Sequence, residues 1–242
     1  MGGAARVWSE WWGMQAGGWR KDVVLFDFDG TLMDSAALVR ESTHYALRAV
    51  LGLDVEDARL RPYFGRLLED QFRELVPDAD AATLERLLMT YRAHQAARHD
   101  QAVRPCPGAV ETVRRLAAAG LRLAVVSSKR RALLRRGLAA LGLEGAFHAV
   151  VDADSTTRHK PDPEPVRLAL SLLGDPPPAR AVMVGDSPYD MAAATAAGVT
   201  AVAVRTPGFT AAELRAAGAA AVLADLRDFV HWLQQREEAG PA

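Results

Sequence analysis

Cysteine is almost absent from this sequence, since Cys106 is the single cysteine among 242 residues. One cysteine excludes an intrachain disulfide and is typical of a reducing compartment, which favours a cytoplasmic location. Cys106 lies between Pro105 and Pro107 and has no partner at metal-ligand spacing. It is therefore interpreted as a small buried residue and not as a nucleophile.

The sequence also lacks long apolar runs and an excess of charge. No stretch is long and apolar enough to predict a membrane span, and the first residues lack the pattern of a signal peptide. The formal net charge is -1 and no basic block is present, which argues against a nucleic-acid surface. We therefore expect neither nucleic acid nor membrane as a partner, and a monomer or homodimer.

Residues 1–21 are unusual because they combine four tryptophans with several glycines: Trp8, Trp11, Trp12 and Trp19. This segment is interpreted as an N-terminal extension that is either disordered or covers apolar surface of the body with its aromatic rings. A contact with a second chain or with a membrane surface is the alternative.

The remainder of the chain alternates between strand-like and helix-like segments. Residues 23–26 form an unbroken apolar run, which predicts a strand buried on both faces. Similar short apolar segments recur at residues 121–127, 149–152, 181–185 and 199–204, and stretches of helical periodicity separate them. This alternation predicts an α/β fold with a doubly wound parallel sheet.

Residues 37–100 interrupt the alternation, because they show helical periodicity without strand-like patterns. We expect helices up to residue 51 and over residues 56–61, 67–75 and 81–98. The sequence thus predicts three parts, an N-terminal extension (1–21), an α/β core (22–36 and 101–242) and a helical insertion (37–100).

Polar side chains follow the predicted strands where each one ends: Asp27, Asp29, Ser127, Lys160, Asp186 and Asp190. Because the carboxyl ends of parallel strands meet at one edge, we expect these side chains to converge. Such a cluster is unfavourable unless a cation and an anion occupy it. Carboxylates without histidine or thiolate ligands favour Mg²⁺ over zinc. The lysine, the serine hydroxyl and the backbone amides near Gly30 suit a phosphoryl group.

The stretch Asp27-Phe28-Asp29-Gly30-Thr31-Leu32, directly after an apolar strand, resembles the Asp-x-Asp-Gly-Thr signature of the haloacid dehalogenase superfamily. The order and spacing of the other polar residues are similar to its remaining motifs over residues 22–233. The resemblance implies a Rossmann-like core and a helical C1 cap, which corresponds here to the insertion.

Residue by residue, the resemblance implies that Asp27 is the nucleophile that forms an aspartyl-phosphate and Asp29 the general acid and base. Ser127 and Lys160 match the phosphate-binding motifs, and Asp186 matches the Mg²⁺ carboxylate. The implied metal set comprises Asp27, the backbone carbonyl of Asp29 and Asp186, with Asp190 supporting that shell. The remaining positions expected near the substrate are Gly30, Thr31 and Ser128.

Within the superfamily the sequence resembles phosphoglycolate phosphatases and PpaX-type pyrophosphatases at residues 65–72, 160–166 and 184–187. Residues 65–69 are similar to the substrate-specificity loop of the cap. There Arg66 is expected either to pair with an anionic substrate group or to be a solvated charge at a helix end.

The predicted function is a Mg²⁺-dependent phosphatase that hydrolyses a small phosphorylated metabolite or inorganic pyrophosphate. A phosphomutase of the β-phosphoglucomutase type is the alternative. Two further aspartates are interpreted as helix caps, Asp34 before the first insertion helix and Asp162 before Pro163.

Overall fold

The structure, a computed structural model, describes residue 19 and residues 21–235. The predicted N-terminal extension, with Trp8, Trp11 and Trp12, therefore lies almost entirely outside the described residues. Trp19 packs against an apolar cluster of the core. Within the described ranges, no helix combines the length and the apolar character that a membrane crossing requires.

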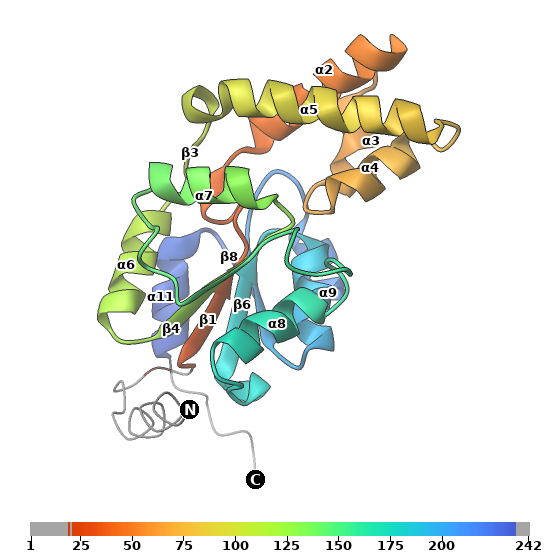
Figure 1. Ribbon diagram of the computed structural model, residues 1–242. Coiled ribbons are helices and arrows are strands. Elements are labelled where there is room, and N and C mark those ends of the chain that lie inside the picture. Colours follow the sequence, from red (N-terminus) through yellow and green to blue (C-terminus); the bar gives the residue numbers. More distant parts are fainter. Residues whose placement is uncertain (1–18, 20, 236–242) are drawn as a thin grey trace, which may run out of the picture.

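A parallel sheet of six strands forms the centre of the described chain (Figure 1). In spatial order the strands are β5 (Ala149–Val151), β4 (Arg122–Val126), β1 (Val23–Phe26), β6 (Ala181–Gly185), β7 (Thr200–Val204) and β8 (Ala221–Leu223). Strand β1 is central, and Phe26 lies opposite Val125 of β4 and Val184 of β6. The predicted doubly wound parallel sheet is confirmed.

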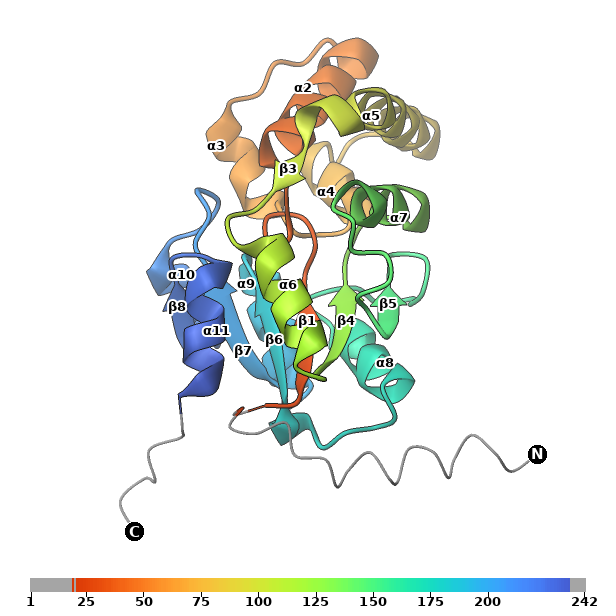
Figure 2. The same cartoon turned by 90° about the vertical axis from the view of Figure 1, so that its left-hand side faces the viewer.

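Helices cover both faces of this sheet (Figure 2). One face is covered by α6 (Ala109–Ala118), α7 (Arg131–Ala140) and α11 (Leu226–Gln234). The other is covered by α8 (Glu164–Leu172), α9 (Pro188–Ala196) and α10 (Ala211–Ala216), with a short 3-10 turn, η2 (Pro178–Arg180), before β6. Successive β1 side chains point to opposite faces, so Val24 joins the first apolar cluster and Val23 the second. Burial on both sides explains the unbroken apolar run.

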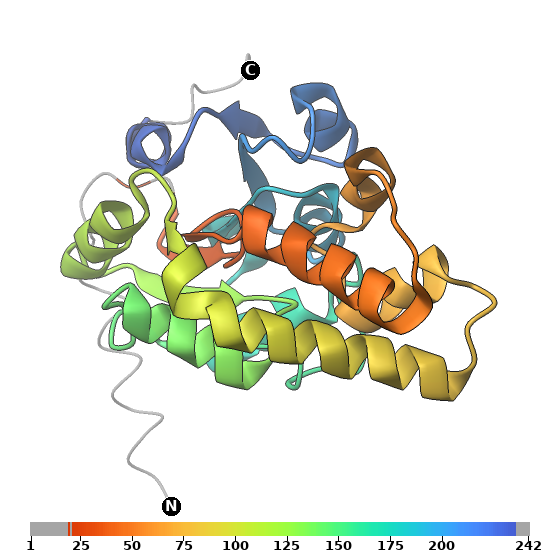
Figure 3. The same cartoon turned by 90° about the horizontal axis from the view of Figure 1, so that it is seen from above.

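The helical insertion lies above the carboxyl edge of the sheet. It contains α2 (Ala36–Leu51), α3 (Asp57–Leu60), η1 (Arg61–Tyr63), α4 (Leu68–Leu75) and α5 (Ala81–Ala102). Helices α2 and α5 lie side by side (Figure 3). The insertion has its own apolar cluster, in which Phe72 and Tyr91 meet edge to face at 6.1 Å between ring centroids. Two short antiparallel strands, β2 (Met33–Asp34) and β3 (Arg104–Pro105), connect it to the core.

Some elements are absent from the sequence prediction, namely α10, β8, β2 and β3. Helix α10 is short and alanine-rich, and β8 is a half-buried edge strand of three residues, so neither carries a clear apolar period. The two strands of the connection have two residues each and form only because the chain leaves and re-enters the core at the same place.

Candidate active site

A tight turn after β1 places two aspartates at the centre of the carboxyl edge. Asp27 continues the β1–β6 ladder, since its backbone N–H donates to the carbonyl of Val184 at 2.9 Å, and its side chain is buried. Gly30 then adopts a φ of 83°. A Cβ at Gly30 would lie 2.2 Å from Asp186 Oδ2, so only glycine allows this close approach of the turn to the end of β6.

A buried lysine joins two carboxylates, one directly after β1 and one in the first turn of α9. Lys160 Nζ donates to Asp27 Oδ1 at 2.7 Å, to Asp190 Oδ1 at 2.6 Å and to the carbonyl of Val126 at 3.2 Å. Burial by itself would lower the pKa of Lys160, but the charges of Asp190 and Asp27 outweigh burial and raise that pKa. The lysine is therefore held as an ammonium ion beneath the site.

Asp190 is held in place by the start of α9. The Ser187 hydroxyl accepts from the backbone N–H of Asp190, and the Asp190 carboxylate accepts from the backbone N–H of Ser187, which together form a capping box. Asp190 Oδ2 also accepts from the Ser187 hydroxyl at 2.6 Å. Gly185 gives it room, because a Cβ there would lie 2.5 Å from the Asp190 side chain. Asp190 is thus both an acid in the first turn of α9 and a residue of the site.

Three carboxylates at this edge fit a divalent cation. Oxygen atoms of Asp27, Asp186 and Asp190 lie within 4.8 Å of one another. They face one ammonium group, that of Lys160, which leaves two negative charges for a cation to balance. Hard oxygen ligands of this kind suit Mg²⁺. The side chain of Asp29 is not in this group, and its predicted metal contact through the backbone carbonyl stays a prediction.

The same crowding changes the acidity of two carboxyl groups. Burial, reinforced by the charge of Asp190, raises the pKa of Asp27 to about 7, although Lys160 opposes the shift. Burial, followed by the charges of Asp27 and Asp190, raises the pKa of Asp186 well above its ordinary value. Asp186 accepts a hydrogen bond from the Thr206 hydroxyl at 3.1 Å. In both carboxyl groups the ionised form is thus disfavoured, and a nearby cation would favour it.

Asp29 is oriented by a residue that sequence reasoning missed. Lys129 Nζ lies 2.8 Å from Asp29 Oδ1 and 3.0 Å from Oδ2 and is itself buried. The Ser35 hydroxyl donates to the same carboxylate. The signal in the sequence is the run Ser127-Ser128-Lys129 directly after an apolar strand, which places a lysine at the sheet edge.

Ser35 also explains why one predicted cap is wrong. Ser35, and not Asp34, directly precedes α2, and its side chain makes no capping hydrogen bond. The predicted cap at Asp34 is therefore wrong. The hydroxyl that would cap the helix is used by Asp29 instead. Asp162 Oδ1 does accept from the backbone N–H of Glu164, the first residue of α8, at 2.9 Å, although Pro163 and not Asp162 directly precedes that helix.

The serines after β4 occupy two different positions. Ser127 is buried, and its Oγ accepts from the backbone N–H of Lys129 at 3.1 Å. Ser128 points to the insertion and donates to the carbonyl of Gly65 at 3.2 Å. Thr31 is also fully buried, and its hydroxyl has no hydrogen-bond partner among the described residues. A buried unpaired hydroxyl beside the aspartate turn is consistent with a ligand contact.

Two cavities separate the insertion from the core. One of about 360 Å³ is lined by Asp27, Asp29, Ser127, Ser128 and Lys129, and by Arg66 of the insertion. Another of about 450 Å³ is lined by Asp29, Gly30, Thr31 and Asp186. The structure thus brings every predicted site residue to this edge.

Arg66 lines the first cavity, yet it is already paired. Its two Nη atoms donate to Glu74 at 2.7 and 2.6 Å, and its guanidinium lies 5.7 Å from the centre of the Tyr189 ring. The predicted contact between Arg66 and the substrate would require the guanidinium to leave Glu74, and it stays a prediction.

With this geometry established, the sequence model described as haloacid dehalogenase-like hydrolase matches residues 24–204. The chain therefore belongs to the haloacid dehalogenase-like hydrolase family, and it is an enzyme of the hydrolase class. The pyrophosphatase PpaX of Bacillus velezensis is 35% identical over 179 residues, which is 74% of this chain and 81% of that protein. A PpaX protein of Caldanaerobacter subterraneus subsp. tengcongensis is 40% identical over 182 residues, 75% of this chain and 80% of that one.

A solved structure extends the comparison to the fold. The hydrolase from Pseudomonas syringae has a TM-score of 0.80 at 26% identity, and the match covers 87% of this chain and 97% of that one. The superfamily resemblance of the motifs is therefore confirmed by a sequence model, by relatives and by a shared architecture.

The acidity of Asp27 predicts a specific pH dependence of stability. Its folded pKa of about 7 exceeds the ordinary 3.8, so between these values the folded state holds a proton that the unfolded state releases. The free energy of unfolding therefore falls as pH rises through this window, by up to about 1.4 kcal/mol per pH unit for one proton. Asp27→Asn should reduce that slope, measured by urea unfolding in chelator. Equal slopes in both proteins would contradict the assignment.

Proposed function

We propose that this hydrolase is a Mg²⁺-dependent phosphatase that forms an aspartyl-phosphate on Asp27 and acts on a small phosphorylated metabolite or inorganic pyrophosphate in the cytoplasm. The observation that carries the proposal is the placement of Asp27 at the end of β1, between Lys160, Asp186 and the cavity. The pyrophosphatase relatives support the substrate class, and the single cysteine supports the compartment.

Lys160 keeps the nucleophile ready for in-line attack. Its contact with Asp27 Oδ1 occupies one carboxylate oxygen, so the other oxygen is left to attack phosphorus. The raised pKa of Asp27 shows that the carboxylate form needs further positive charge. A Mg²⁺ ion held by Asp27 and Asp186 would supply that charge and would neutralise the phosphoryl oxygens.

Asp29 is placed to move the protons of both half-reactions. Its carboxylate lines the same cavity as Asp27 and is held by Lys129 and Ser35. In its protonated form it would give its proton to the leaving oxygen in the first step, and the carboxylate that results would take a proton from the water that attacks the aspartyl-phosphate in the second. Ser127 and the backbone amides of the turn at Gly30 are expected to bind the phosphoryl oxygens during both steps.

Asp27→Asn tests the nucleophile directly. The amide keeps the size of the side chain but removes the attacking oxygen, so phosphate release should fall to background while the circular dichroism spectrum stays that of the parent protein. Phosphate release is measured with Mg²⁺ and several phosphorylated substrates. Turnover within a few-fold of the parent protein would rule out an aspartyl-phosphate on this residue.

Asp29→Asn should have a different signature. Without the acid and base, turnover is expected to fall by roughly 10²–10⁴-fold. Acid quenching after a pulse of labelled substrate should still recover phosphate bound to protein, because Asp27 is intact. Rates equal to those of the parent protein would eliminate the proton-transfer role of Asp29.

The identity of the metal provides a further test. Mg²⁺ should restore activity after treatment with chelator, and Ca²⁺ should not, because Ca²⁺ takes more oxygen ligands at longer distances and would draw both oxygens of Asp27 into coordination. The measurement is phosphate release in metal titrations. Full activity in excess chelator, or equal rates with Ca²⁺, would contradict the metal assignment.

A further inference from the structure

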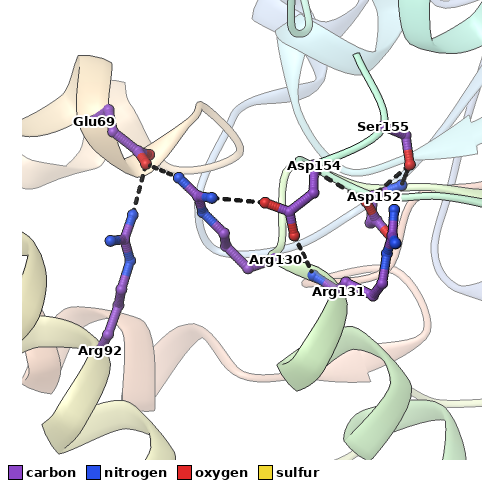
Figure 4. A network of polar contacts seen from close by, with 7 residues as sticks. All are labelled: Glu69, Arg92, Arg130, Arg131, Asp152, Asp154 and Ser155. Atoms are coloured by element: carbon purple, nitrogen blue, oxygen red, sulfur yellow. Dashed lines mark hydrogen bonds and ion pairs between the residues drawn. The ribbon is translucent and has the colours of Figure 1, made fainter. Parts of the chain in front are cut away.

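Two arginines converge on one carboxylate oxygen among the residues that line the cavity (Figure 4). Glu69 Oε1, on α4, accepts from Arg92 Nη2 of α5 at 2.6 Å and from Arg130 Nη2, just before α7, at 2.5 Å. All three residues line the cavity of about 360 Å³ that also contains Asp27 and Asp29. The insertion supplies Glu69 and Arg92, and the core supplies Arg130.

Arg130 keeps its place without Glu69, because the core holds it independently. Its Nη1 donates to Asp154 Oδ1 at 2.6 Å, and Asp154 Oδ2 accepts from the backbone N–H of Arg131 at 3.1 Å. The loop is fixed further by Asp152, which accepts from the backbone N–H of Asp154 at 3.0 Å. Arg130, which lines the cavity, is thus held by Asp154 through one Nη atom and contacts Glu69 through the other (Figure 4).

Arg92 has hydrogen-bonding capacity left over. Its Nε is buried and, among the residues that the structure describes, has no hydrogen-bond partner. Asp154 and Glu69 balance the charges of the two guanidinium groups, but on the insertion side both arginines share the single oxygen Oε1 of Glu69. A phosphoryl group or another oxyanion offers more charge or more acceptor oxygens than Glu69 alone and pairs well with guanidinium N–H groups.

We propose that Arg92 and Arg130 form a second anion subsite, occupied by Glu69 in the free protein and by a distal anionic group of the substrate in the complex. This inference rests on the proposed phosphatase function, with transfer at Asp27. The substrate class is a small phosphate ester or anhydride with a second oxyanion, either the phosphoryl group of pyrophosphate that is not transferred or the carboxylate of a phosphorylated acid. Glu69 acts here as an internal competitor.

Steady-state kinetics on three substrates test the subsite. Pyrophosphate and 2-phosphoglycolate carry a second oxyanion, and p-nitrophenyl phosphate does not. Arg92→Gln and Arg130→Gln should raise KM for the first two by roughly 10- to 100-fold, as expected for a charged hydrogen bond, and this loss should exceed the loss on p-nitrophenyl phosphate about tenfold or more. Glu69→Gln should lower KM for the two substrates with a second oxyanion, because the competing charge is gone.

Arg136→Gln is the matched control. Arg136 on α7 also bridges the core to α5, through Asp100 at 2.7 Å and the carbonyl of Ala96 at 2.9 Å, but it does not line the cavity. This variant removes the same charge and a comparable bridge, and its preference among the three substrates should equal that of the parent protein. Circular dichroism and urea unfolding verify that each variant is folded.

The outcomes separate the inference from the proposed function. Three results would overturn the subsite and assign these residues to closure of the insertion. The first is an equal loss on all three substrates in Arg92→Gln and Arg130→Gln. The others are the same change of substrate preference in Arg136→Gln and a higher KM in Glu69→Gln. If the parent protein releases phosphate from none of the substrates with Mg²⁺, the proposed function fails as well. The substrate with the larger loss identifies the distal group as phosphoryl or carboxylate.

Discussion

Lys160 is buried between the carboxylates of Asp27 and Asp190, and the rest of the site depends on this arrangement. An ammonium group in this position is stable only when its charge and its N–H groups are satisfied, and two carboxylates and a backbone carbonyl satisfy them. The same contact leaves Asp186 and part of the charge of Asp27 uncompensated. That excess of negative charge suits a divalent cation, and a bound cation would in turn attract an anionic phosphoryl group.

The sheet order brings these charges together. The chain builds β4 and β5 on one side of β1 and then β6, β7 and β8 on the other. The chain therefore leaves the carboxyl ends of β1 and β6 toward opposite sides of the sheet, and the aspartates lie in the crevice between the two loops. Glycine at positions 30 and 185 completes the arrangement, because a larger residue at either position would collide with Asp186 or Asp190.

The insertion adds recognition to a core that supplies chemistry. Its helices form an apolar cluster of their own, and two of its polar contacts with the core, Gly65 with Ser128 and Glu69 with Arg130, join residues that line the cavity. Because Glu69 and Arg92 come from the insertion and Arg130 from the core, the proposed anion subsite is complete only when the two surfaces meet. Under this proposal, the groups that would select the substrate are also groups that join the insertion to the core.

The sequence by itself determined the alternation of strands and helices, the helical insertion and the residues at the strand ends, because these features follow from local apolar periods and from short motifs around Asp27, Asp186 and Lys160. Only the tertiary structure decided which polar groups pair. Lys129 and Asp29 are separated by a hundred positions, and Arg92 and Arg130 meet across two surfaces. Ser35 serves Asp29 and not its own helix. Such pairings depend on the packing of distant segments, which no local pattern encodes.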